Sequence, residues 1–247
     1  MKIRTLILLL VIGGCTAFIF LKIQSLGPEN SSFNQTTRYT LGKYPIVRYI
    51  LGLHLDGDAR AEYLVGNSPI VVEIVQAPNA HLTEAVIKQF TDKVTKYTGR
   101  QTSVINVDII KPGILNDVDL SEVVKNYRRH IFPGQPNLFV IYANDFAGGE
   151  SEAARTYKEF GMVISDSKLS AVTGPYKEGL DQYIISTMLH EFGHQLGLDH
   201  ININGCIMDA DVESPGAQSN FTGIYTPVNF CLEELDKLLQ IKKSLNK

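Results

Sequence analysis

The stretch HEFGHQLGLDH, residues 190–200, holds half of the six histidines in this chain. On a helix, His190 and His194 are four residues apart, so both imidazoles project from one face and can bind one metal ion. Glu191 is turned about 100° from His190 around the helix axis. Its carboxylate can therefore reach a water on that ion without being a ligand itself.

A third ligand is available a few residues further on. Gly197 can adopt the left-handed conformation that ends a helix, and the chain can then double back to bring His200 to the ion. Three neutral imidazoles with one open position are typical of catalytic zinc, whereas structural zinc is usually closed by four ligands rich in cysteine. The HExxH pattern alone arises often by chance, but five fixed positions that include three histidines do so far more rarely. The spacing therefore predicts a catalytic zinc site.

The five fixed positions of this stretch, HExxHxxGxxH, resemble the zinc signature of the metzincin metalloproteases: His190, Glu191, His194, Gly197 and His200. Met208, in GCIMD, matches the methionine turn that this family places beneath the metal. The resemblance implies an α/β (α+β) zincin fold, in which a twisted, mostly parallel sheet carries two packing helices. It also implies an active-site helix, a methionine turn and a C-terminal helix.

The same resemblance implies a mechanism. One catalytic zinc ion would be held by the three histidines, with Glu191 as the general base of peptide-bond hydrolysis. The substrate would be a peptide or protein, lying extended against an edge strand for which residues 160–165, FGMVIS, are the candidate. Residues 209–230 would wall the pocket beyond the scissile bond.

Within the metzincins, the chain is most similar to archaemetzincins, whose pattern HCx4CxM with a later FCxxC supplies four cysteines to a second zinc ion. Here Cys206 and Cys231 are kept, but Ile201 and Glu234 replace their partners, so we expect the second, structural zinc to be absent. A disulfide between Cys206 and Cys231 would then pin the methionine turn to the C-terminal helix. Two buried free thiols are the alternative. Adamalysins are the competing resemblance, because they also carry CIM and a later cysteine.

The elements that position this site follow from the hydrophobic pattern after Ser68. Strand and helix patterns alternate, which favours an α/β sandwich on a mostly parallel sheet. The strands are expected at 69–75, 102–110, 137–143 and 160–165, and the helices at 81–99, 119–132 and 180–197. The last helix carries a broad apolar stripe, with the histidines off the stripe. The other histidines, His54, His81 and His130, are expected at the surface or at helix ends.

The N-terminus differs sharply in composition from the rest of the chain. Thr5–Leu21 carries no charge over 17 residues, with Lys2 and Arg4 before it and Lys22 after it. This pattern favours a single-pass signal anchor with the catalytic domain outside the cytoplasm. A lipoprotein signal ending at Cys15 and a cleaved secretory signal are the alternatives. The predicted division is a membrane segment at 1–26, a stem at 27–67 and a catalytic domain at 68–247.

The overall composition limits the classes of partner that this chain is expected to bind. The net charge is −3 and the sequence pI is about 6.1, so the chain lacks the basic footprint of nucleic-acid binding. A membrane and a peptide or protein substrate are the expected partners. The alternative function is a membrane-tethered protein that binds zinc without turnover, against which the presence of Glu191 argues.

Overall fold

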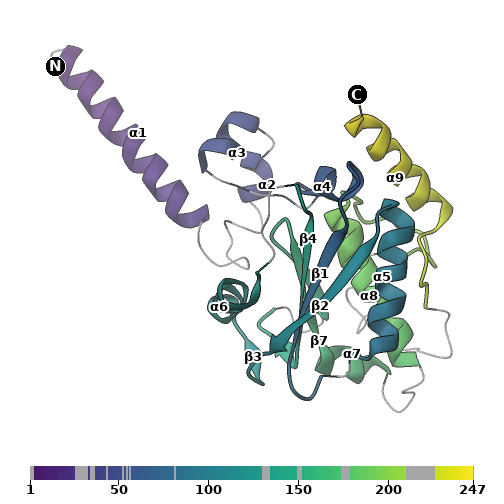
Figure 1. Cartoon of the computed structure of the whole chain (residues 1–247). Helices are drawn as coiled ribbons and strands as arrows, with labels where there is room; N and C mark the ends of the chain where they lie inside the picture. Colours follow the sequence, from purple (N-terminus) through teal and green to yellow (C-terminus); the bar gives the residue numbers. More distant parts are fainter. Residues whose placement is uncertain are drawn as a thin grey trace. The chain divides into compact units, whose positions relative to one another are not determined.

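The computed structural model of the chain describes residues 3–25, 33, 37–42, 44–51, 53, 55, 57–80, 82–129, 134–148, 152–173, 179–209 and 226–246. The chain forms two compact units, Met1–Leu55 and Asp56–Lys247. The described helices of the first unit are α1 (Ile3–Ser25), α2 (Arg38–Gly42) and α3 (Pro45–Leu51). All the described strands belong to the second unit (Figure 1).

The uncharged N-terminal run forms α1. The end of α1 is tied to the end of α3, because Lys22 Nζ and Ser25 Oγ both donate to the carbonyl of Leu51, at 2.6 and 3.1 Å. Among the described residues, no helix combines the length and the apolar content that crossing a membrane requires. The predicted signal anchor is therefore not supported by these helices, and the cellular location stays a prediction.

The second unit is built on a five-stranded sheet with the order β2-β1-β4-β7-β6. Its strands are β1 (Ile70–Gln76), β2 (Thr102–Ile109), β4 (Asn137–Ala143), β6 (Ala154–Tyr157) and β7 (Gly161–Ser165). Every neighbouring pair is parallel except β6 with β7, which is antiparallel. A short parallel pair, β3 (Ile114–Leu115) with β5 (Asp145–Phe146), lies apart from this sheet. The predicted α/β class with a mostly parallel sheet is confirmed.

The strand at the edge of the sheet differs from the one that the sequence predicted. Residues 160–165 were expected to form the edge strand, but β7 lies between β4 and β6. The strand at this edge is β6, ARTY, which reaches β7 through a tight turn in which Lys158 has φ 54°, and β2 forms the opposite edge. The pattern missed β6 because it is four residues long and has polar side chains at its two central positions, Arg155 and Thr156.

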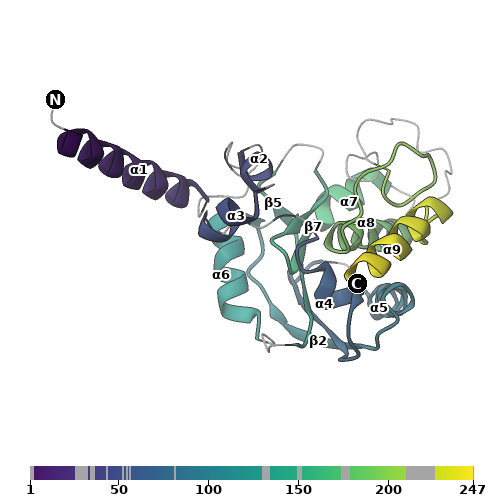
Figure 2. The ribbon, with the colours of Figure 1, turned by 90° about the horizontal axis from the view of Figure 1, so that it is seen from above.

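Helices cover both faces of the sheet. Helices α5 (Glu84–Thr98), α8 (Leu180–Gln195) and α9 (Leu232–Leu245) lie on one face and α6 (Asp117–Tyr127) on the other (Figure 2). Two short helices, α4 (Arg60–Leu64) and α7 (Asp166–Thr173), complete the described elements. Strand β1 is buried on both faces, sending Val72 and Ile74 to the α8 side and Val75 to the α6 side. A nearly continuous apolar run is the signature of such a strand, and in β1 the buried Glu73 is the interruption.

Candidate metal centre

Helix α8 is held by the apolar stripe that the sequence predicted. Ile184, Met188 and Phe192 recur at four-residue spacing and are all fully buried in the core. The Phe192 ring meets the rings of Tyr63 and Phe90 edge-on, with centroids 5.6 and 6.2 Å apart. These contacts set the rotation of the helix, and therefore the side from which its histidines project.

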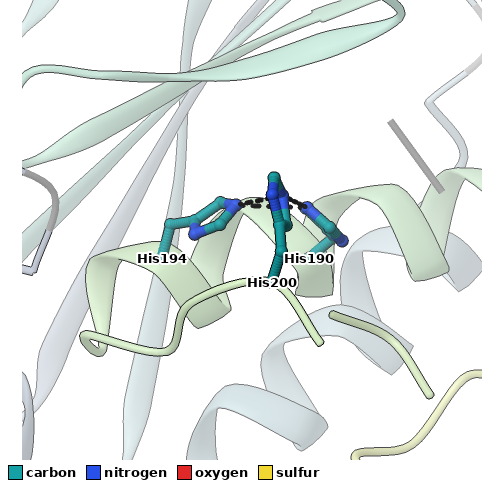
Figure 3. A group of neighbouring side chains, drawn as sticks. All are labelled: His190, His194 and His200. Atoms are coloured by element: carbon teal, nitrogen blue, oxygen red, sulfur yellow. Dashed lines mark hydrogen bonds between the residues drawn. The ribbon is translucent and has the colours of Figure 1, made fainter. Parts of the chain in front are cut away.

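The three predicted ligands converge. The Nε2 atoms lie 3.2 Å apart between His190 and His194, and His200 Nε2 lies 3.1 Å from each of them. Figure 3 shows His190 and His194 rising from α8 while His200 reaches over from the segment that follows it. His190 is buried, His194 is half-buried and His200 is exposed, so the group opens to solvent on the side of His200.

Backbone carbonyls set the tautomer of two rings. His190 Nδ1 lies 2.6 Å from the carbonyl oxygen of Ile207, and His194 Nδ1 lies 2.9 Å from that of Leu198. A carbonyl can only accept, so each Nδ1 must carry the hydrogen, and each Nε2 of the neutral ring presents a lone pair. Two lone pairs 3.2 Å apart repel, and a cation between them removes that repulsion.

The spacing fits zinc. Zinc–nitrogen bonds of about 2.0–2.1 Å at tetrahedral angles put ligand nitrogens roughly 3.3–3.4 Å apart. The observed separations of 3.1–3.2 Å are close to that value. In the described part of the chain, no fourth His, Cys, Asp or Glu joins this group. Three imidazoles with one remaining position match a catalytic rather than a closed structural site.

Gly197 lets the chain reverse direction after α8, so that His200 reaches the other two histidines. It has φ +86°, and the amides of Gly197 and Leu198 donate to the carbonyls of His194 and Gly193, both at 2.9 Å. The helix therefore ends with a left-handed glycine, as the spacing predicted, and His200 follows three residues later.

A second glycine, in the segment that the sequence assigned to a stem, packs against this helix end. A Cβ atom on Gly57, which has φ +76°, would lie 2.7 Å from the Cα atom of Gly197. The position of that Cβ atom is fixed by the backbone of residue 57, and the atom it meets belongs to the backbone of Gly197. No side-chain rotation can therefore relieve the contact. Sequence reasoning gave Gly57 no role, and only the fold brings it to the metal site.

The methionine turn, residues 204–208, lies directly against α8. Met208 is fully buried, and a Cβ atom on Gly193 would overlap its sulfur. The amide of Ile201 donates to the carbonyl of Met208 at 2.8 Å, which ties the turn to the segment after His200. Gly193, one of the unspecified positions of the signature, is therefore required by the close approach of Met208.

Cys206 and Cys231 form a disulfide, with Cα atoms 5.3 Å apart. It joins the methionine turn to the residue that caps α9, which is the pairing expected from the two cysteines that remain after Cys15. The two sulfurs and a carboxylate oxygen of Glu234 also lie close enough together to hold a metal ion. Sulfurs bonded to each other are not thiolates, however, and thiolates are what a metal binds.

Glu191 lies on α8 beside His190 and is fully buried. Its carboxylate therefore lies in surroundings of low dielectric, where its interactions with charge are stronger than in water. The arrangement supplies parts of a hydrolytic site, which are a cation cradle with an open side and a buried carboxylate on the residue that follows the first histidine.

Gln195 links the metal helix to the sheet edge. Its Nε2 donates to the carbonyls of Lys158 and Gly161, at 2.9 and 2.8 Å, at the two ends of the turn between β6 and β7. The edge strand is thus held to the same helix as two of the histidines. Sequence reasoning assigned no role to Gln195, and no local signal distinguishes it from any other helical glutamine.

Several sequence predictions fall outside the described residues. These are the placements of His54, His81 and His130, and most of the expected pocket wall, residues 210–225. The described remainder of that segment, residues 226–230, leads into α9. There the amide of Phe230 donates to Tyr97 Oη at 3.0 Å, which anchors the start of α9 to α5.

Solved structures that resemble this chain include two archaemetzincins and a zinc-dependent peptidase. Archaemetzincin from Methanopyrus kandleri is 16% identical with a TM-score of 0.49, covering 72% of this chain and 97% of its own. Archaemetzincin from Archaeoglobus fulgidus, complexed with malonate, is 18% identical with a TM-score of 0.41, covering 68% and 99%. The zinc-dependent peptidase from Methanocorpusculum labreanum is 15% identical with a TM-score of 0.39, covering 70% and 99%.

No protein-family model and no curated protein matches the chain. The identities and TM-scores of the similar structures are low.

Proposed function

We propose that this chain is a zinc-dependent endopeptidase of the metzincin type, most similar to archaemetzincins. The observation that carries the proposal is the convergence of three histidine Nε2 atoms within 3.2 Å of one another. Glu191, which follows His190 on the same helix, is fully buried. Because backbone carbonyls hold two of the rings with Nε2 as a lone pair, the cluster is prepared for a cation.

The chemistry divides between the ion and the chain. Zinc, when bound by His190, His194 and His200, lowers the pKa of water towards neutrality and polarises a carbonyl group. Glu191 then acts as general base, accepting the proton of the attacking water on a carboxylate oxygen. It returns that proton to the amine that leaves. Gly197 and Met208 support the site by placing His200 and by filling the space under α8.

The substrate class follows from the edge of the sheet. An edge strand can take an extended peptide as an additional strand, through backbone hydrogen bonds that do not depend on sequence. The sheet has two edge strands, β2 and β6, and Gln195 joins the turn after β6 to the helix of His190 and His194. We therefore propose that a peptide in extended conformation binds along β6.

The test uses the full chain with a diverse peptide library. Zinc-loaded wild type should cleave internal bonds, a chelator should abolish cleavage, and zinc should restore it. Glu191→Gln should retain zinc while losing at least about 10²-fold in kcat, the lower range for a missing general base. Equal cleavage by wild type and Glu191→Gln would show that Glu191 is not the base. Stoichiometric zinc without cleavage of any peptide would favour the alternative, a zinc-binding protein without turnover.

We also propose that the catalytic unit acts outside the cytoplasm. The disulfide between Cys206 and Cys231 supports this, because such bonds persist in oxidising compartments. The charges flanking Thr5–Leu21 support it as well. Protease added to intact cells that express the full chain should digest the second unit, and fractionation should show whether the protein is membrane-bound or released. Protection from protease until the cells are lysed would refute the proposal.

A further inference from the structure

One peptide group of the methionine turn is hydrogen-bonded on both sides. The carbonyl of Ile207 lies 2.6 Å from His190 Nδ1, and the amide of Met208, in the same peptide unit, donates to Glu234 Oε1 at 2.5 Å. The described chain contains no cis peptide bond, so the carbonyl and the N–H point in opposite directions. Glu234, the peptide group and His190 therefore form one continuous chain of hydrogen bonds.

Backbone N–H groups favour the charged form of Glu234: burial raises the pKa of its carboxyl group, and the hydrogen bonds from the amides of Met208 and Cys231 oppose that rise. Glu234 is 2% exposed, and its second oxygen accepts the amide of Cys231 at 2.6 Å in a capping box at the start of α9. Both oxygens accept from N–H groups, and an N–H donor on each oxygen favours the carboxylate, which is the stronger acceptor at both positions. The negative charge thus faces the N–H side of the Ile207–Met208 peptide.

A buried charge at that position alters the other side of the peptide. Hydrogen bonds in a chain polarise one another, so a carboxylate on the N–H makes the carbonyl oxygen a stronger acceptor. A stronger acceptor at Nδ1–H orients the imidazole and raises the basicity of Nε2 as a metal ligand. This chain of hydrogen bonds ends on His190, whereas the ring of His194 is held by the carbonyl of Leu198.

We propose that Glu234 is a positioning residue for zinc binding, acting on His190 through the Ile207–Met208 peptide. The inference rests on the proposed zinc site. It gives a role in that site to a residue on α9, 44 positions after His190, whose link to that ligand runs through a backbone peptide. Glu234 thus has a role beyond capping α9.

The experiment compares Glu234→Gln with Glu233→Gln in the full chain. Glu233 is the neighbouring exposed residue of the same helix turn, so its variant makes the same change in charge without touching the peptide. Zinc affinity is measured by competition with a chelator. We expect about tenfold weaker binding for Glu234→Gln, the lower range for lost outer-sphere partners, and unchanged binding for Glu233→Gln.

A spectroscopic readout separates this role from simple capping. In the zinc-loaded protein, the ring N–H proton of His190 should move upfield in Glu234→Gln, because its hydrogen bond weakens. That of His194 should stay in place and serves as the internal reference. Wild-type zinc affinity together with an unmoved His190 signal in folded Glu234→Gln would overturn the inference.

If Glu234→Gln does not fold, Glu234→Asp is used to test the inference. This variant keeps the negative charge but has a shorter side chain, which draws the carboxylate away from the amide of Met208. A His190 signal that shifts while that of His194 does not supports the inference, and two unmoved signals refute it. Failure of the proposed function looks different. Zinc-loaded wild type would then cleave no peptide, while the Glu234 variants would still change zinc affinity and the His190 signal.

Discussion

Removing the disulfide between Cys206 and Cys231 gives the prediction with the best-defined magnitude. The bond spans 25 positions, and the chain-entropy relation for a loop of that size gives about 3.5 kcal/mol at 25 °C. For a protein of this size, 1 kcal/mol moves the melting temperature by roughly 2–4 °C. The Cys206→Ser, Cys231→Ser double variant should therefore melt roughly 7–14 °C below wild type.

The assay is thermal unfolding followed by circular dichroism, with and without reductant. Cys15→Ser is the matched control, because Cys15 is an exposed free thiol and its loss should leave the melting temperature unchanged. Reductant should lower the melting temperature of the control and should not change that of the double variant. Equal melting temperatures for the double variant and the control, in non-reducing buffer, would show that the disulfide does not stabilise this fold.

The remaining predictions concern packing and metal content. Gly193→Ala should cost about 1–3 kcal/mol in urea unfolding, because its Cβ atom overlaps the sulfur of Met208; an unchanged midpoint would mean that Met208 moves aside freely. Gly57→Ala should be destabilised by at least as much, because it meets the backbone of Gly197 and has φ +76°. Wild-type stability in that variant would show that residue 57 does not pack on α8. Gln195→Ala should raise KM for peptides more than it lowers zinc affinity, since it frees the turn beside β6; the opposite ratio would place its effect at the metal. Elemental analysis should find one zinc per folded chain, and two would indicate a second site.

The local part of the metal centre could be predicted from the sequence. His190 and His194 share a face because of helix periodicity, and the left-handed conformation at Gly197 is one that glycine adopts without strain. The alternation of strand and helix patterns likewise gave the mostly parallel sheet. Each of these conclusions depends on residues close together along the chain, where geometry follows from backbone conformation alone.

The tertiary structure decided which distant groups meet. The edge strand is β6 rather than β7, because strand order depends on pairing between segments and not on the apolar pattern within one of them. Gly57, Gln195 and Glu234 serve the site through contacts with residues 34 or more positions away or, for Glu234, with a turn 26 positions earlier. A polar residue or a glycine has the same local signature whether it faces solvent or a metal-binding helix. Its role is therefore set by the partner that folding brings to it.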